Sequence, residues 1–461
     1  MPRLFPLALL WLIAGTAAAA PDEVHEFKLD NGLKLIVKED HRAPVVVSQV
    51  WYKVGSSYEH SGITGLSHLL EHMMFKGTRK HGPNEASRII SANGGRENAF
   101  TGRDYTTYYQ QLEKSRLPVS FELEADRMRN LLLKQEEFTK ELHVVMEERR
   151  LRTDDDPESL TYEHFAATAF HNGPYQNPVI GWMDDLENVK LDDLKQWYRT
   201  WYAPNNATVV VVGDVQPDEV FALAKKYFGP LKPSKLTQLK PRREVEQKGM
   251  RRAIVKAPAE LPYLLMGYQA PSLTASNGAD VEPYALEVLS GILSGGNSAR
   301  LAKHLVREAR IAASAGAGYN LYSRVPDLFM LEGTPAQGRT IAELEQALRD
   351  QIKRLQDEPV SEAELSRIKA QVVAGKVYEQ DSTFGQAMQI GTLETVGIGW
   401  RLQDSFVERI NAVTAEQIQQ VARKYLIDDH LTVAVLEPLP LDPNKKPRAP
   451  LDGHLGGGNV R

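Results

Sequence analysis

Hydrophobic and polar residues alternate along several short stretches of the chain, and this pattern predicts β-strands. The alternation at residues 26–37 runs through Asn31-Gly32, a pair that favours a tight turn between antiparallel strands. Residues 45–54 predict a further strand, and the valine-rich run at 208–213 predicts a buried one. The first part of the chain therefore contains a β-hairpin and further strands.

Stretches with helical spacing separate these strands. In the first part of the chain they lie at 65–75, 186–202 and 217–228. The second part repeats the plan, with strands predicted at 253–255, 264–268 and 431–436 and helices at 283–293 and 406–426. A helical stretch leading into a buried strand thus occurs near the end of both parts. This repetition predicts two similar α+β halves.

The composition between the halves gives the domain limits. Residues 231–248 are rich in Pro, Lys and Arg and lack hydrophobic periodicity, which predicts a linker. The linker separates an N-terminal domain at 20–230 from a C-terminal domain at 249–440. Residues 441–461, rich in Pro, Gly and charge, predict a mobile tail.

Residues 1–19 have the layout of a secretory signal peptide. Arg3 precedes an apolar run at 4–14, and small residues follow. Because proline directly after the cleaved bond makes a poor substrate, we expect cleavage after Ala19 rather than one residue later. An uncleaved membrane anchor is the alternative, but the run is shorter than the roughly 20 residues that a spanning helix needs. No later segment predicts a membrane span.

Composition narrows the possible chemistry. The 461 residues suit two or more domains, and the net charge of -5, without a basic patch, argues against a nucleic-acid partner. The chain has no cysteine, so disulfides, a thiol nucleophile and cysteine metal ligands are excluded. Any metal must be held by nitrogen and oxygen atoms.

The segment at 65–75 carries the strongest chemical signal. His68 and His72 are four residues apart and lie on one face of a helix, so both can bind one metal ion. Glu71 projects from nearly the same face, and the remaining positions are mostly apolar. Two unrelated histidines beside a surface glutamate are the alternative. The complete H-x-x-E-H string is the inverted zinc motif, and it favours a zinc site.

A third protein ligand is expected on a second helix. Residues 136–151 predict a helix that carries Glu141, Glu147 and Glu148. Glu141 and Glu148 are seven residues apart and share a face, whereas Glu147 points elsewhere. From the pattern alone, these acids are also typical of a solvated helix surface.

These motifs resemble the pitrilysin family of inverted-motif zinc metallopeptidases, which includes insulin-degrading enzyme and the mitochondrial processing peptidase. The resemblance rests on His68-Leu-Leu-Glu-His72, the following Phe75-Lys-Gly-Thr78, the stretch Glu141–Glu148, Tyr202-Ala-Pro-Asn205 and the strand ending at Gly213-Asp214. It implies two homologous α+β domains, each a mostly antiparallel sheet with helices packed on one face. It also implies that Glu148, 76 residues after His72, is the third zinc ligand and that Glu141 supports the site.

The resemblance implies a zinc endopeptidase that cuts peptides or unfolded precursor segments. One zinc ion per chain, preferred over manganese or cobalt for its ligand types, activates water, and Glu71 acts as general base. Asn98, Ala99 and Phe100 match the edge strand that pairs with substrate, although an ordinary internal strand is the alternative. With the signal peptide, the resemblance to bacterial relatives implies a periplasmic location.

The second half departs from the family pattern. Arg307 matches a substrate-binding arginine, but Ser314 stands seven residues later where single-chain relatives have a tyrosine, and Tyr319 is out of register. We therefore expect a heterodimer with a same-fold subunit that supplies the tyrosine, or less favourably a homodimer. Two other functions stay open: a non-catalytic structural subunit of the same fold, and a periplasmic zinc-binding or zinc-buffering protein.

Overall fold

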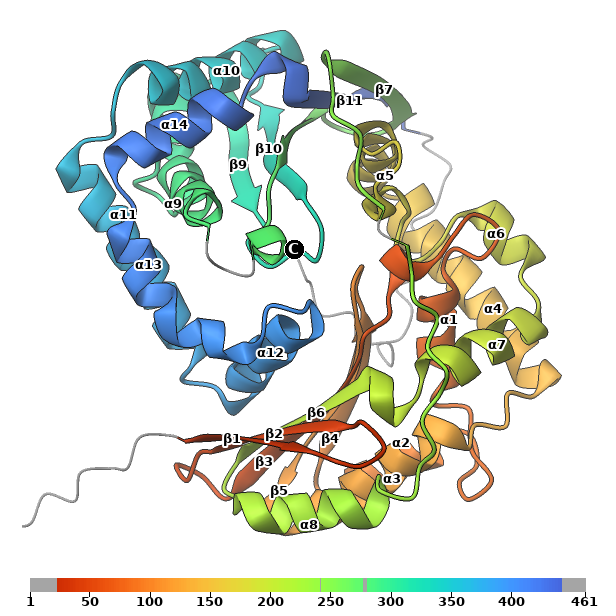
Figure 1. Ribbon diagram of the computed structural model, residues 1–461. Helices are drawn as coiled ribbons and strands as arrows, with labels where there is room; N and C mark the ends of the chain where they lie inside the picture. The colour runs from red at the N-terminus through yellow and green to blue at the C-terminus, as the bar shows by residue number, and fades with distance from the viewer. Residues whose placement is uncertain (1–22, 241, 277–279, 442–461) are drawn as a thin grey trace, which may run out of the picture.

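The computed structural model describes residues 23–240, 242–276 and 280–441. Two β-sheets, each with a layer of helices, are built from successive parts of this chain (Figure 1). The predicted signal peptide at 1–19 and residues 442–461 of the predicted tail lie outside the described residues. No helix among those described is long and apolar enough to cross a membrane.

The first sheet has six strands in the order β1-β2-β6-β3-β5-β4. Only β2 and β6 run parallel, so the sheet is mostly antiparallel, as predicted. The hairpin around Gly32 is confirmed, because β1 pairs with β2 across a turn in which Gly32 has φ of 91°. The strands are β1 (Val24–Lys28), β2 (Lys34–Glu39), β3 (Val45–Tyr52), β4 (Arg96–Thr101), β5 (Thr106–Glu113) and β6 (Ala207–Gly213).

The second sheet repeats this topology with five strands in the order β7-β11-β8-β10-β9. Its one parallel pair, β7 and β11, occupies the place of β2 and β6 in the first sheet. The prediction of two similar halves is therefore confirmed. The strands are β7 (Arg251–Pro258), β8 (Tyr263–Ala270), β9 (Ala312–Tyr319), β10 (Asp327–Pro335) and β11 (Leu431–Leu439).

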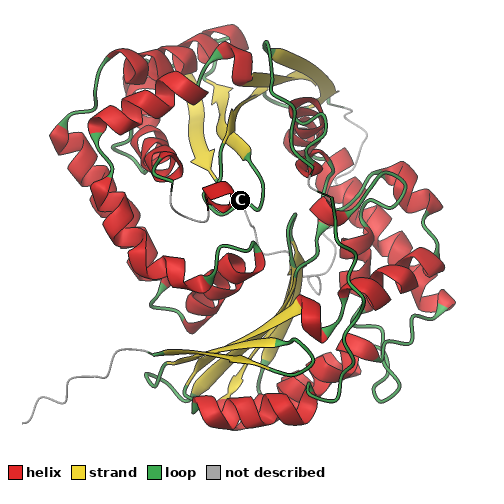
Figure 2. Cartoon of the chain, viewed as in Figure 1, coloured by secondary structure: helices red, strands yellow, loops and turns green. Residues whose placement is uncertain are grey.

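Each half packs its own helices on one face of its sheet (Figure 2). In the first half these are α1 (Leu66–Met73), α2 (Glu85–Ala92), α3 (Leu117–Arg129), α4 (Gln135–Arg149), α6 (Met183–Asn188), α7 (Leu191–Trp201) and α8 (Pro217–Tyr227). In the second half they are α9 (Glu282–Ser294), α10 (Ile341–Asp357), α11 (Glu362–Glu379), α13 (Phe406–Ala412) and α14 (Ala415–Tyr425). The predicted helices at 186–202 and 406–426 are each divided into two, because Val189-Lys190 and Val413-Thr414 have extended backbone.

The opposite face of each sheet is covered by a helix from the other half, which the sequence did not predict. The helix α12 (Thr383–Thr395) packs Ala387 and Ile390 on the first sheet, and α5 (Pro157–Ala169) packs Phe165 and Ala169 on the second (Figure 1). Successive residues of one strand therefore face different cores. This is why the valine run at 208–213 is apolar throughout.

The contact between α12 and the first sheet depends on a glycine. A Cβ atom added at Gly391 would lie 2.0 Å from Cε2 of the buried Trp51. We expect Gly391→Ala to destabilise the protein by about 1–3 kcal/mol through overpacking. Gly375 is the matched control, since it is exposed in α11 with nothing within 4 Å of an added Cβ. There the same change should stabilise by about 0.5–1 kcal/mol through helix propensity. Urea unfolding of both variants checks the opposite signs, and equal stabilities would contradict this account.

Candidate metal centre

The helix α1 is fixed at its first turn by the residues that precede it. Gly65 has φ of 83°, and a Cβ atom there would lie 2.4 Å from the carbonyl oxygen of Ile180, so this position requires glycine. The backbone N–H groups of Gly65 and Ser67 donate to the two carboxylate oxygens of buried Glu59, at 2.8 and 2.7 Å. Glu59 thus satisfies donors that the helix start leaves free and sets the direction of α1.

His68, His72 and Glu148 come together between α1 and α4, as the sequence predicts. The Oε2 atom of Glu148 lies 3.8 Å from Nε2 of His68 and 3.4 Å from Nε2 of His72. One ligand atom from each of the three residues lies within 4.8 Å of the other two. His72 and Glu148 are buried, with 4% and 2% exposure, so these polar groups have been withdrawn from water into one small space.

The donor set fits a zinc ion. Ligand atoms about 2.0–2.1 Å from a tetrahedral zinc stand about 3.3 Å apart, close to the two separations from Glu148. Within the described residues, the buried Oε2 atom of Glu148 makes no hydrogen bond of regular geometry beyond its ion-pair contacts with the two imidazoles, although a buried carboxylate oxygen without one is costly. Two imidazoles and one carboxylate leave a fourth position open, which is the arrangement of catalytic rather than structural zinc sites.

Charges around the site shift the pKa values of all three ligands. Burial opposes ionisation of Glu148, but contact with His72, His68 and Arg152 outweighs it and lowers the pKa of Glu148 to about 2. Burial lowers the pKa of His68 to about 3, so its imidazole is neutral. Ionised carboxylates and neutral imidazoles are the forms that bind metals. Burial opposes protonation of His72, but the contacts with Glu141 and Glu148 prevail and raise its pKa to about 9, so a metal ion that binds there must displace a proton. Sequence reasoning missed Arg152, whose Nη1 atom lies 2.7 Å from Oε1 of Glu148; its spacing of four residues was the available signal.

Glu141 contacts the back of His72 rather than the space between the ligands. Its Oε2 atom lies 3.3 Å from Nδ1 of His72, and its Oε1 atom lies 2.7 Å from Nζ of Lys76. With Nε2 of His72 directed at Glu148, this contact fixes the orientation and tautomer of the imidazole. Burial raises the pKa of Glu141, but the contacts with His72 and Lys76 prevail and lower it. Lys76, which sequence reasoning missed, follows His72 by one helical turn.

We expect Glu141→Gln to weaken zinc binding by about 10- to 100-fold, because the amide removes the charge that orients His72. Competition with a chromophoric chelator measures this change. Glu137→Gln is a matched control, because Glu137 lies one turn earlier on α4 and pairs with the exposed Lys140. Equal zinc affinity of wild type and Glu141→Gln would show that Glu141 does not position His72 for metal binding.

Glu71 lies beside the ligands and is held by the neighbouring strand. The hydroxyl of Thr101 in β4 donates to Oε2 of Glu71 at 2.5 Å. Burial raises the pKa of Glu71 to about 7, against the opposing hydrogen bond from Thr101. A carboxyl group with this pKa exchanges a proton readily near neutral pH, as a general base must. Sequence reasoning missed Thr101, since a contact between a helix and a strand leaves no local spacing.

The predicted substrate strand is the edge of the first sheet. Within the described residues, β4 pairs only with β5, so the other side of β4 is unpaired. Ala99 is buried in the core beneath α1, and Phe100 packs at right angles to Trp51 on the opposite face. Asn98 accepts a hydrogen bond from the backbone of Ala99. The roles of Asn98, Ala99 and Phe100 toward a substrate stay a prediction.

Arg307 is not part of this cluster. It lies in η7 (Leu301–Glu308), a π-helical segment of the second half, where its exposed guanidinium donates to the carbonyl oxygen of Asn297 at 2.5 Å. Ser314 is exposed on the edge strand β9, and the hydroxyl of Tyr319 donates to the carbonyl oxygen of Pro271. The predicted role of Arg307 in substrate binding stays a prediction.

Comparison of the sequence with known proteins identifies relatives over nearly the whole chain. Residues 34–182 match the family described as Insulinase (Peptidase family M16), and residues 188–372 match the Peptidase M16 inactive domain. The zinc protease PqqE of Helicobacter pylori is 33% identical over 416 residues, covering 89% of this chain and 92% of that protein. Zinc protease SCO5738 of Streptomyces coelicolor is 28% identical over 415 residues, covering 87% of each.

Solved structures share the architecture. A protease from Helicobacter pylori superposes with a TM-score of 0.86 at 30% identity, covering 90% of this chain and all of that one. At 17% identity, where only the fold is shared, a peptidase M16 inactive domain from Pseudomonas fluorescens has a TM-score of 0.81, covering 91% of this chain and 100% of its own. A chain of complex III2 from Candida albicans has a TM-score of 0.74, also at 17% identity. The match covers 90% of this chain and 96% of that one.

Proposed function

Because the chain belongs to peptidase family M16, the insulinase family, we propose that it is a zinc-dependent endopeptidase that hydrolyses peptides or unfolded precursor segments. The observation that carries the proposal is the convergence of His68, His72 and Glu148 beside the buried carboxyl of Glu71. A site that only stored zinc would need no such acid next to the open position. We propose one zinc ion per chain, which is supported by the one cluster of candidate ligands found in the described residues.

Each residue of the site has a separate role in the proposed hydrolysis. His68, His72 and Glu148 would hold the zinc ion, which when bound would supply the acidity that activates water and polarises a carbonyl group. Glu71 accepts a proton from the attacking water and later donates it to the leaving amine. Thr101 donates to Oε2 of Glu71 and so holds this carboxyl group in place. Glu141 holds the imidazole of His72 in place.

The unpaired edge of β4 supports recognition of extended peptides. A peptide strand added at Asn98, Ala99 and Phe100 would bond through its main chain, so binding would depend little on the substrate's side chains. Thr101 ends the same strand and contacts Glu71, so a peptide along β4 would pass the catalytic acid. This arrangement supports cleavage of unfolded segments.

We further propose that the enzyme acts in the periplasm with a partner. The signal-peptide pattern of residues 1–19 supports export. Arg307 is exposed, and Ser314 lacks the phenol expected at its position, so a same-fold subunit would contribute the tyrosine. A heterodimer is preferred over a homodimer for this reason.

Hydrolysis of a mixed peptide library by the purified chain tests the proposal. We expect cleavage that stops with a chelator, returns with one equivalent of zinc, and rises when a same-fold subunit is added. Full activity of the chain as a monomer would contradict the proposed partner but not the proposed peptidase activity. Zinc binding without cleavage, with or without such a subunit, would favour the alternative of a non-catalytic structural subunit.

A further inference from the structure

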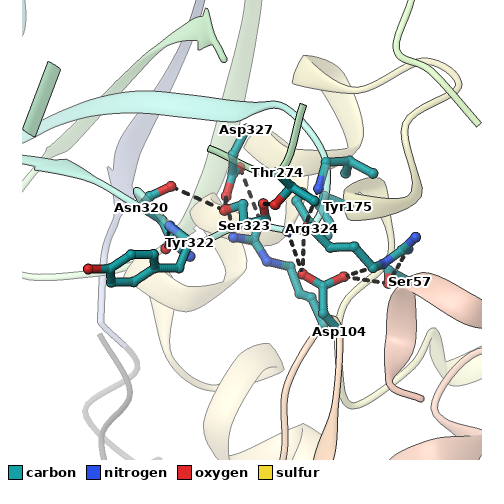
Figure 3. A network of polar contacts seen from close by, with 11 residues as sticks. Ser57, Asp104, Tyr175, Thr274, Asn320, Tyr322, Ser323, Arg324 and Asp327 are labelled. Atoms are coloured by element: carbon teal, nitrogen blue, oxygen red, sulfur yellow. Dashed lines mark hydrogen bonds and ion pairs between the residues drawn. The ribbon is translucent and has the colours of Figure 1, made fainter. Parts of the chain in front are cut away.

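A largely buried network of charges joins the two halves (Figure 3). Arg324 of the second half donates through Nε to Asp104 at 3.0 Å and through Nη2 to the hydroxyl of Ser57 at 2.8 Å. Its backbone N–H donates to the hydroxyl of Tyr175, which itself donates to Asp104. Asp104, Ser57 and Tyr175 are all buried residues of the first half, so Arg324 is the partner that completes their hydrogen bonds.

A second pair crosses the same boundary with reversed charges. Arg103, next to Asp104 in the first half, makes a two-pronged contact with Asp327 of the second half. Asp327 also accepts a hydrogen bond from Ser323 at 2.9 Å. Each half thus supplies one arginine and one aspartate, and the two aspartates are only 6% exposed. Each guanidinium donates through two of its nitrogen atoms, and such a two-point contact fixes both the distance and the orientation between the two halves.

One side of the network leads to the start of α1. Ser57, which contacts Arg324, lies in η1 (Ser56–Tyr58), and the guanidinium of Arg324 covers the ring of Tyr58 at 4.6 Å. The next residue is Glu59, whose carboxylate holds the backbone N–H groups of Gly65 and Ser67. A shift of η1 would therefore move the helix that carries both histidines and Glu71.

The other side leads to the end of β4. Gly102 donates from its backbone to the carbonyl of Tyr105, so residues 102–105 form a tight turn that contains Arg103 and Asp104. Ser57 donates from its backbone to the carbonyl oxygen of Arg103 at 2.8 Å, which ties this turn to η1. The residue before the turn is Thr101, the donor to Glu71. Both elements that position Glu71 are thus tied to the turn that Arg324 and Asp327 hold.

We propose that Arg324 and Asp327 are positioning residues for the metal centre, through which the second half of the chain sets the geometry of the site in the first half. This role rests on the proposed function for its effect on catalysis, but its effect on zinc affinity is independent of any peptide substrate. A displacement of about 1 Å at reacting groups can cost about 100-fold in rate. The competing reading is that these residues only hold the halves together.

A matched control separates the two readings. Lys34 in β2 and the buried Glu394 in α12 also pair across the halves, with Nζ 2.5 Å from Oε1. This pair lies between the first sheet and α12. Arg324 instead contacts Ser57 and Tyr58, which directly precede Glu59, and Asp104, which follows Thr101 by three residues. Glu394→Gln should therefore lower stability without changing the metal centre.

The experiment compares Arg324→Ala, Arg324→Lys and Glu394→Gln in the full chain with any subunit that activity requires. We expect Arg324→Ala to weaken zinc binding about tenfold or more and to lower kcat with a smaller change in KM. Arg324→Lys, which keeps the charge but not the fork, should fall between Arg324→Ala and wild type. Glu394→Gln should match wild type in zinc affinity and kcat. The visible spectrum of the cobalt-substituted protein should change only in the Arg324 variants.

The proposal is overturned if Arg324→Ala and Glu394→Gln change zinc affinity equally, or if neither changes it. If Arg324→Ala does not fold, Ser57→Ala replaces it, because that change removes only the hydroxyl between Arg324 and Asp104. Unchanged zinc affinity in a folded Ser57→Ala protein would then overturn the proposal. If wild type cuts no peptide, the proposed function fails, while zinc affinity still decides the role of Arg324.

Discussion

Glu71→Gln is expected to lower kcat by about 10²- to 10⁴-fold while leaving zinc content at the wild-type level. Glutamine has nearly the same shape as glutamate and can still accept the hydrogen bond from Thr101. It cannot accept the proton of the attacking water, so only the proton transfer is lost. Steady-state hydrolysis of a peptide, with zinc content measured on the same samples, checks both parts.

Two variants make this result interpretable. Glu147→Gln changes a surface glutamate of α4 that pairs with Arg150, and it should leave kcat unchanged. Glu71→Asp keeps the acid but shortens its reach, so it should retain more activity than Glu71→Gln. Activity of Glu71→Gln within threefold of wild type would show that another group takes the proton, and loss of zinc from it would make the variant uninformative about catalysis.

Glu148→Gln is expected to weaken zinc binding by more than the roughly 10- to 100-fold that a supporting residue contributes, because it removes a ligand. Among the residues that the structure describes, Glu148 carries the only carboxylate paired with the Nε2 atoms of both histidines. An amide oxygen there is a poorer ligand, and the loss should abolish peptide cleavage at stoichiometric zinc.

Thermal unfolding gives a readout of this loss without any substrate. Zinc at 100 times its dissociation constant should stabilise wild type by about 2.7 kcal/mol, because it binds the folded state. The shift should vanish in Glu148→Gln and persist in Glu147→Gln, which changes the adjacent glutamate on the surface. A zinc-dependent shift of wild-type size in Glu148→Gln would mean that the metal binds elsewhere.

Local sequence patterns predicted some of the elements, including both helices of the candidate metal centre, but not β5, β9 or β10, nor helices such as α10, α11 and α12. The spacing of His68 and His72 fixes them on one helical face, and the spacing of Glu141 and Glu148 does the same on α4. Spacing alone did not decide whether those acids were surface residues, and only the resemblance assigned Glu148 to the metal. The structure separates the two glutamates into one that faces the ligands and one that supports His72.

Contacts between distant segments were not predictable in this way. Arg103, Asp104, Arg324 and Asp327 look like ordinary surface charges in the sequence, and only the fold brings them together. The valine run in β6 indicated burial on both faces, but nothing in it named α12 as the cover. Such pairings depend on the path of the whole chain. Hydrophobic periodicity within one segment carries no information about that path.

The exchange of α5 and α12 makes the order of synthesis matter. The ribosome completes the first sheet long before it reaches α12, so the apolar face around Trp51 has no cover while the second half is being made. A fragment that stops after the first half would keep this face open to water and prone to aggregate. We therefore expect the two halves to fold as one cooperative unit, and each half expressed alone to be unstable.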